Sequence, residues 1–201
     1  AGWEPASLDA LTALRGRLPV FFPPDPTETT ATIGGMIACN ASGARTFKYG
    51  PTRKYVEGLR VVLADGSTVS LRRGQAKARG RRFSVTCENG RKIEGALPSY
   101  NLPAVKNAAG YFVEDDMDLV DLFVGSEGTL GVVTEAELLL LPEAGFEWGV
   151  MAFFKSESDA LKFVRLIRGE AAGKESPPIA LPPAAIEFFD SRALDLLREK
   201  K

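Results

Sequence analysis

Two glycine-containing segments carry residue types that could hold a cofactor. The first runs Thr32-Ile33-Gly34-Gly35 and continues, after four residues, into Asn40-Ala41-Ser42-Gly43. Because glycine has no β-carbon, backbone N–H groups there can converge on a phosphate or approach a flavin edge closely. The side chains of Asn40 and Ser42 could also hydrogen-bond a heteroaromatic ring. No general phosphate-binding motif is matched, so a cofactor loop and a pair of ordinary glycine turns both explain this segment.

The second segment is Gly125-Ser126-Glu127-Gly128-Thr129-Leu130-Gly131, immediately before a predicted strand over Val132–Leu141. Glycines at this spacing are compatible with close approach to a ligand. A helix C-cap followed by a β-bulge is the simpler explanation when the segment is considered alone.

Other chemistry is limited by composition. The chain of 201 residues has no histidine, which excludes a Ser-His-Asp triad, a histidine metal site and a histidine general base within it. Its cysteines, Cys39 and Cys87, are too few for a disulfide scaffold or a four-cysteine zinc site, and we expect both to be reduced, buried side chains. Glu114, Asp115, Asp116 and Asp118 could bind a cation, but their crowding favours a helix N-terminus and we predict no metal site.

The charges are balanced, with 25 Lys and Arg against 26 Asp and Glu and a net charge of −1. A basic stretch, Arg72–Arg82, could dock a nucleic acid or an acidic partner. It has no interleaved aromatic residues, so a solvated loop is the preferred interpretation and no nucleic-acid partner is expected. No apolar run approaches the length of a membrane span, and the chain is expected to be soluble and cytoplasmic.

Several elements must position these segments. Residues 19–26 are proline-rich and should be extended, because proline fixes φ and disfavours helix at the preceding residue. The turn residues Asp65-Gly66 and Asn89-Gly90 predict two hairpins. The expected elements before residue 142 are a helix over 7–16, hairpin strands over 59–63 with 68–71 and 83–87 with 91–94, a short helix over 118–124 and the strand over 132–141.

A change in pattern at Pro142–Gly145 predicts a domain boundary. Beyond it we expect a strand over 147–154 and a helix over 157–167 that begins with a capping box of Ser156 and Asp159. A second strand over 186–189 and a helix from Asp190 to Arg198 follow. This order is typical of the beginning of an α+β unit.

Taken together, the motifs resemble one family. They are Phe22–Pro26, Ala31–Gly35, Asn40–Gly43, Lys48–Gly50, Val61–Gly66 and Gly125–Glu135, in that order. The series is similar to the FAD-binding (PCMH-type) domain of the vanillyl-alcohol-oxidase superfamily. The nearest branch contains D-lactate dehydrogenase, the glycolate oxidase flavoprotein subunit and D-2-hydroxyglutarate dehydrogenase. The resemblance covers about residues 5–142.

The resemblance implies an α+β fold in two parts. Residues 1–142 would form the second FAD-binding subdomain, a mixed or antiparallel sheet flanked by helices, and residues 143–201 the start of an α+β cap domain. The family's first FAD-binding subdomain would be missing, so the chain is expected to be a fragment. The residues implied to line FAD are Pro24, Asp25, Thr32, Ile33, Gly34, Gly35, Asn40, Ala41, Ser42, Gly43, Gly50, Glu127, Gly128, Gly131, Val132 and Val133.

The implied function is oxidation of a 2-hydroxy acid, such as D-lactate, glycolate or D-2-hydroxyglutarate, by hydride transfer to flavin. Expected partners are that acid, an electron acceptor and a second copy of the chain in a homodimer. No catalytic acid or base is identified, and we expect the chain alone to turn over no substrate. The alternative is a non-catalytic fragment that serves only as a scaffold or interaction module.

Overall fold

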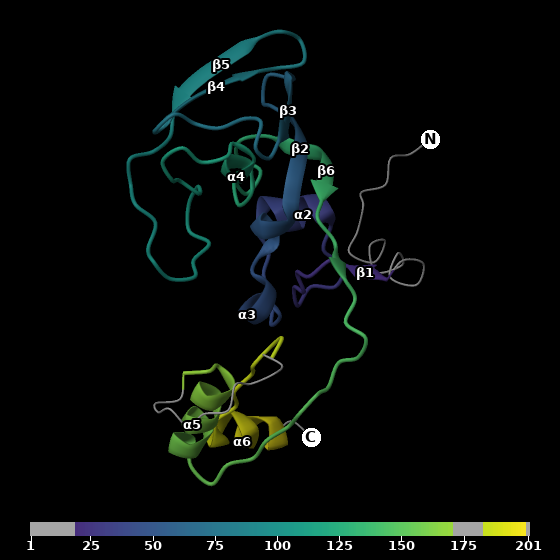
Figure 1. The fold of residues 1–201 in the computed structure, drawn as a ribbon, viewed down its shortest axis with the longest axis vertical. Coiled ribbons are helices and arrows are strands. Elements are labelled where there is room, and N and C mark those ends of the chain that lie inside the picture. The colour runs from purple at the N-terminus through teal and green to yellow at the C-terminus, as the bar shows by residue number, and fades with distance from the viewer. Residues whose placement is uncertain (1–18, 171–182, 200–201) are drawn as a thin grey trace.

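The computed structural model describes residues 19–170 and 183–199, and it combines short helices with antiparallel sheets (Figure 1). The expected α+β class is confirmed, while the expected helix over 7–16 lies outside the described residues. The elements are β1 Val20–Phe21, α2 Ile33–Ala38, α3 Thr46–Tyr49, the 3-10 helix η1 Thr52–Tyr55, β2 Val56–Val62, β3 Thr68–Arg72, β4 Arg82–Thr86, β5 Lys92–Ala96, α4 Val120–Phe123, β6 Val132–Leu138, β7 Leu141–Pro142, α5 Glu157–Ile167 and α6 Ser191–Glu199.

The central sheet has the strand order β3-β2-β6 and is antiparallel throughout. The first predicted hairpin is confirmed, with Val61 opposite Val69 and with Gly66 at a φ of 81° in the connecting turn. On the other side of β2, the strand β6 pairs Val62 with Val132. This pairing brings the start of β6, and the turn Gly125–Gly131 before it, beside the end of β2, which lies about seventy residues earlier in the chain.

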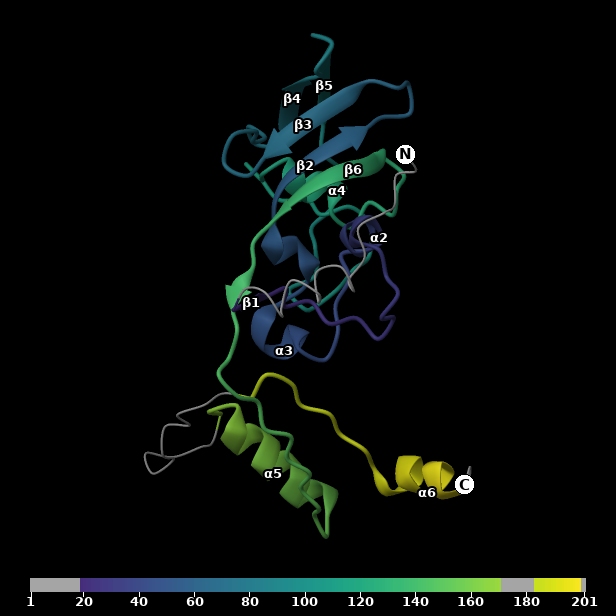
Figure 2. The same ribbon diagram turned by 90° about the vertical axis from the view of Figure 1, so that its right-hand side faces the viewer.

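The core lies between this sheet and the short helices. Met36 and Ile37 of α2, Tyr55 of η1 and Leu119 and Val120 beside α4 are almost fully buried against the β2 side chains. Figure 2 shows the three strands side by side, with α2 and α4 close to them. The helices of this region are only one or two turns long, so burial and not intrinsic propensity must stabilise them.

The strand predicted over 132–141 is two strands. β6 ends at Leu138, and the chain then forms β7, which pairs with β1 so that Phe21 lies opposite Leu141. Between them the Leu139 N–H donates to the carbonyl oxygen of Tyr55, the residue before β2, at 2.8 Å. The prediction of extended chain over 19–26 fits this closure, because β1 lies within it.

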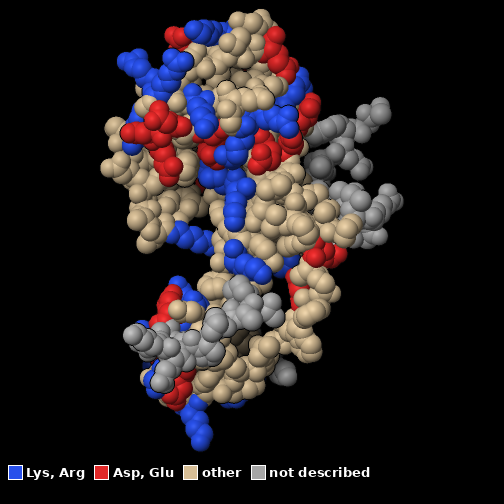
Figure 3. Space-filling model, viewed as in Figure 1, with Lys and Arg blue, Asp and Glu red and all other residues tan. Residues whose placement is uncertain are grey.

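The second predicted hairpin, β4–β5, is also confirmed, with Gly90 at a φ of 84° in its turn. It stands beyond β3 (Figures 1 and 2). Its turn is tied to the sheet because the Glu88 N–H donates to the Thr68 carbonyl oxygen at 2.9 Å. Basic and acidic side chains are intermixed over this part of the face drawn in Figure 3.

Three expectations about single residues are wrong. Cys39, expected to be buried, is exposed at the end of α2, whereas Cys87 is buried as predicted. The acidic residues 114–116 do not begin a helix, because α4 starts only at Val120. The basic stretch is not uniformly solvated, since Arg73 donates to the Asp121 carboxylate at 2.8 Å.

Beyond β7 the chain leads away from the sheet to α5 and α6 (Figure 2). Both predicted helices are confirmed, including the cap in which the Asp159 N–H donates to Ser156 Oγ at 3.2 Å. The strands predicted over 147–154 and 186–189 are wrong, because neither segment forms a β-ladder with another described segment. In the described ranges, no helix is long and apolar enough to span a bilayer.

Candidate functional site

The structure brings the two glycine segments into direct contact. The Gly125 N–H donates to the Ile37 carbonyl oxygen at 2.9 Å, and the Glu127 N–H donates to the Ala38 carbonyl oxygen at 2.8 Å. A β-carbon on Gly34 would lie 3.8 Å from the Val133 carbonyl oxygen. The end of α2 and the turn before β6 therefore form one continuous surface, although nearly ninety residues separate them (Figure 1).

Gly34 and Gly35 do not form an irregular loop, as the cofactor-loop interpretation assumed. They lie in the first turn of α2, where Thr32 is the N-cap and its Oγ1 accepts the Gly35 N–H at 3.0 Å. Glycine is unfavourable inside a helix by about 1 kcal/mol. The helix forms because Met36 and Ile37 are buried on its inner side, which leaves Gly35 exposed on the outer side.

The turn after α2 is fixed by its own hydrogen bonds. Asn40 has a φ of 47°, and its Oδ1 accepts the Arg53 N–H at 2.9 Å. The Ala41 carbonyl oxygen accepts both the N–H of Thr52, at 3.0 Å, and its Oγ1, at 2.7 Å. The sequence suggested that the Asn40 side chain could hydrogen-bond a heteroaromatic ring. Because its Oδ1 accepts the Arg53 N–H, its amide NH₂ is the group that remains available to a ligand. The Ser42 hydroxyl has no hydrogen-bond partner among the described residues.

Asp25 lies against this turn, and Pro24 before it is buried. A β-carbon on Gly43 would collide with the Asp25 carbonyl group, so glycine is required for the two segments to touch. Arg45 reinforces the contact, with its Nε 3.3 Å from Asp25 Oδ2. Gly50 is placed differently: it ends α3 at a φ of 85° and donates its N–H to the Thr46 carbonyl oxygen.

The turn before β6 has the positive φ values that glycine favours. Gly125 and Gly128 have φ of 84° and 75°, and Glu127 has a φ of 54°. At Gly131 a β-carbon would lie 2.7 Å from both Val61 Cγ1 and the Val62 carbonyl oxygen. The explanation by a helix C-cap and a close backbone approach therefore holds in part. Gly125 follows the end of α4, and Gly131 lets the chain pass close to β2.

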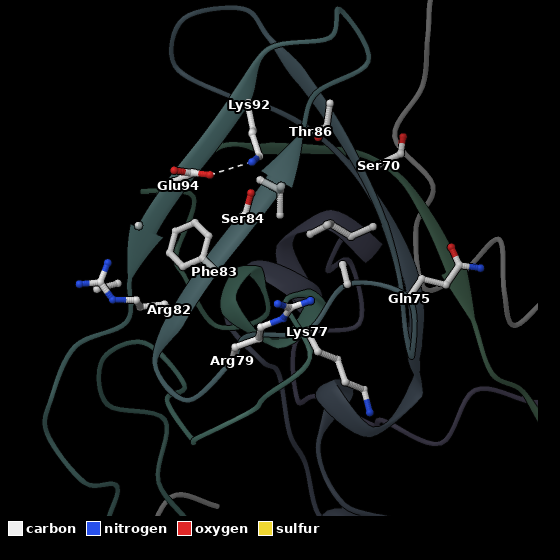
Figure 4. Close-up of a pocket in the computed structure, with 15 residues that line it drawn as sticks. Ser70, Gln75, Lys77, Arg79, Arg82, Phe83, Ser84, Thr86, Lys92 and Glu94 are labelled. Atoms are coloured by element: carbon white, nitrogen blue, oxygen red, sulfur yellow. Dashed lines mark ion pairs between the residues drawn. The ribbon is translucent and has the colours of Figure 1, made fainter.

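A prominent hollow in the described part of the chain lies elsewhere. It has a volume of about 900 Å³ and lies between the end of β3, the following loop and the β4–β5 hairpin (Figure 4). Phe83 and Arg79 face it, and the Lys92 ammonium across it is paired with Glu94 at 2.9 Å. None of the predicted site residues lines this hollow.

Sequence reasoning missed a buried charged cluster beneath the glycine turns. Arg53 and Arg73 both donate to the carboxylate of Asp121, and all three side chains are largely buried. Burial lowers the pKa of Arg53, and the Asp121 carboxylate opposes this, whereas the hydrogen bond to Asp121 raises the pKa of Arg73. A signal was present in the sequence, because Asp121 interrupts the otherwise apolar run Leu119–Val124. A carboxylate on an apolar helix face requires a buried cation.

Comparison with known proteins agrees with the resemblance. Residues 4–72 match the family model described as "FAD binding domain". The chain is 36% identical over 176 residues to a D-lactate dehydrogenase of Archaeoglobus fulgidus, covering 87% of this chain and 29% of that protein. It is 34% identical over 194 residues to the glycolate oxidase subunit GlcD of Bacillus subtilis, covering 96% of this chain and 32% of that protein.

A D-2-hydroxyglutarate dehydrogenase of Xanthomonas citri pv. viticola is 36% identical over 111 residues, covering 55% of this chain and 16% of that protein. A solved structure of an alkyldihydroxyacetonephosphate synthase matches with a TM-score of 0.48 and 22% identity over 82% of this chain and 23% of that chain. The chain spans about a third of the length of the curated relatives first named.

The sequence matches point to an FAD-binding class of protein. Residues 4–72 are similar to the FAD binding domain, and FAD is the cofactor of that domain. The surface described above fits such a cofactor, because Gly35 and Gly128 have no side chain to block approach to the backbone and the apolar side chain of Val132, at the start of β6, is 66% exposed.

Proposed function

We propose that this chain is the FAD-binding part of a flavin-dependent enzyme that oxidises a 2-hydroxy acid of the D-lactate, glycolate or D-2-hydroxyglutarate type. One observation carries the proposal: the turn after α2 and the turn before β6 join into one surface of open backbone and exposed apolar side chains. The names of the similar proteins supply the substrate class, since all three act on, or are named for, such acids.

In this proposal the predicted residues hold and orient the cofactor. Gly34, Gly35 and Gly128 would allow close approach, and the exposed side chain of Val132 would supply an apolar contact. The side chain of Val133 packs against the core, so this residue would contribute only its backbone. Ser42 and the Asn40 amide NH₂ would hydrogen-bond polar atoms of the cofactor. When bound, FAD supplies the redox chemistry, taking up the hydride that leaves the hydroxy acid. The chain itself supplies position and exclusion of water, and no proton-transfer group is assigned to it.

The domain division is part of the same proposal. Residues 1–142 would be the second FAD-binding subdomain and residues 143–201 the start of a cap over the flavin. The substrate, an electron acceptor and a second copy of the chain are the proposed partners, and the cytoplasm is the proposed location. Support for the division comes from the pairing of β1 with β7, which closes the first unit at Pro142.

Titration of the purified chain with FAD tests the proposal. Saturable binding, followed by flavin fluorescence, is expected for the unsubstituted chain. Gly35→Val should weaken FAD binding by at least about tenfold, because the new side chain projects from the outer side of α2. Its β-carbon would lie 3.0 Å from Thr32 Oγ1. Gly145→Val is the matched control, since nothing lies within 4 Å of a β-carbon there.

Equal binding by the two valine variants, both folded by circular dichroism, would place FAD away from α2. A chain that ignores FAD at millimolar concentration would refute the proposed function of this chain.

A further inference from the structure

One buried side chain connects both turns of the candidate site. Arg53 lies in η1, between the turn after α2 and the end of α4. Its backbone N–H donates to Asn40 Oδ1 at 2.9 Å, and its guanidinium Nη2 donates to the Val124 carbonyl oxygen, immediately before Gly125. Arg53 thus hydrogen-bonds one turn through its main chain and the other through its side chain.

The guanidinium group makes three hydrogen bonds in this position. Nη1 donates to both the carbonyl oxygen and the carboxylate of Asp121, while Nη2 donates to Val124. The plane of the group lies over the ring of Phe112, with Cζ 4.3 Å from the ring centroid. A planar group with several fixed donors can satisfy this set, whereas a lysine ammonium presents a single point of charge.

Packing around Arg53 shows why the second turn must begin with glycine. A β-carbon on Gly125 would lie 3.2 Å from Arg53 Nη2 and 3.3 Å from Asn40 Cβ, and Gly125 has a φ of 84°. The three residues therefore meet at one point beneath the exposed surface. Any change in the position of the guanidinium would be transmitted to the turn that carries Glu127 and Gly128.

Electrostatics keep Arg53 charged in spite of its burial. Burial lowers its pKa, and the Asp121 carboxylate acts against this. Arg73 donates to both oxygens of the same carboxylate, at 2.8 and 3.0 Å, and to the Arg53 carbonyl oxygen at 3.2 Å. The Asp121 side chain is thereby fixed from two sides, and it in turn fixes the guanidinium of Arg53.

We propose that Arg53 is a positioning residue for the cofactor: it sets the distance and orientation between the Asn40 turn and the Gly125–Gly131 turn, and so determines the affinity for FAD. This inference rests on the proposed function. The Arg53 side chain is only 15% exposed and is not one of the residues proposed to line FAD, so it acts through the two turns that it holds.

Two variants of the chain test the role, Arg53→Lys and Arg53→Ala. Arg53→Lys keeps the charge beside Asp121 and is expected to remain folded, but it loses the donors to the main chain. FAD affinity should fall by about tenfold in Arg53→Lys and further in Arg53→Ala, in line with lost hydrogen bonds from a charged donor. Added ethylguanidinium should restore affinity to Arg53→Ala, because it can occupy the vacated space.

Arg60→Ala is the matched control. Arg60 also pairs with two carboxylates, those of Glu88 and Glu135, but on the exposed surface of the sheet. Its loss should leave FAD affinity within about twofold of the unsubstituted chain, and ethylguanidinium should have no effect on it.

Amide hydrogen exchange provides a readout without FAD. In Arg53→Lys, exchange at Gly125 and Glu127 should accelerate at least tenfold relative to amides paired between β2 and β3, since those two amides bond to α2 carbonyls. Unchanged exchange, or unchanged FAD affinity in folded Arg53→Lys, would overturn the inference. Absence of FAD binding by the unsubstituted chain would instead overturn the proposed function, and exchange would still decide whether Arg53 holds the turns.

Discussion

Two regions of this chain are stabilised in different ways. Residues 19–142 contain the buried core, a cluster of apolar side chains packed around the sheet β3-β2-β6. In residues 143–170 and 183–199 most large apolar side chains are exposed, with Trp148 83% and Phe153 80% exposed. The first region is organised by contacts between residues distant in sequence. The second is organised mainly by local hydrogen bonds within and beside α5 and α6, and an ion pair from Glu147 to Arg45 links the two regions.

The difference explains where the candidate site can form. A surface made of two turns from distant parts of the chain needs a rigid support, and the buried side chains of α2, η1 and α4 provide it. Local caps such as Ser156 and Asp190 stabilise single helices but do not fix them relative to one another. Within the proposed function, the first region is therefore the part that would hold the cofactor.

Leucine-to-alanine substitutions should separate the regions most clearly. Leu119 is 1% exposed beside α4, and Leu119→Ala should lower the free energy of unfolding by about 3 kcal/mol through lost burial and a residual cavity. Leu196, in α6, is 63% exposed, so Leu196→Ala should change the free energy of unfolding by less than about 0.5 kcal/mol.

Urea unfolding of both variants, monitored by far-ultraviolet circular dichroism, measures this difference. Similar losses of stability in the two variants would show that α6 is packed in solution, and the contrast between the regions would then fail.

A smaller effect is expected at the cap of α5. Ser156→Ala removes the acceptor of the Asp159 N–H and should destabilise this helix by about 1 kcal/mol. Carbon chemical shifts should therefore move toward coil values over Glu157–Ile167 while those of β2 and β3 stay the same. Ser156→Asp, which retains an acceptor at the N-cap, is the control. A response in the central sheet would indicate tight coupling between the two regions.

The parts of the fold that local sequence could predict are those that local physics determines. Asp65-Gly66 and Asn89-Gly90 supply the turn residues of two hairpins, and both hairpins are present. Ser156 gave the start of α5 correctly for the same reason. The strand predicted over 147–154 failed because the apolar residues of this segment are compatible with an extended chain but do not provide a partner strand.

The site shows the same division. Its glycines marked the two segments, but sequence could not show that Gly34 and Gly35 are helical, since burial of Met36 and Ile37 outweighs their propensity. Arg53 was missed because its partners lie more than sixty residues away along the chain. FAD lining by the predicted residues remains a prediction.

The smallest effect concerns two ion pairs: Arg60 with Glu88, which joins distant segments of the first region, and Lys162 with Asp159, which lies within α5. The hydrogen bonds from Arg60 and then Ser70 lower the pKa of Glu88 to about 2, from an ordinary 4.5. The unfolded state binds more protons than the folded state between these values, so the contribution of Glu88 to stability is present above about pH 4.5 and is lost as the pH falls toward 2. Glu88→Gln should therefore flatten the pH dependence of the unfolding free energy in this window.

Asp159→Asn is the comparison in the second region. The groups that lower the pKa of Asp159 are Ser156 and Lys162, on or beside the same helix, so this substitution should alter only the helicity of α5 in acid. An unchanged acid slope in Glu88→Gln would show that the hairpin is not tied to the sheet through this side chain.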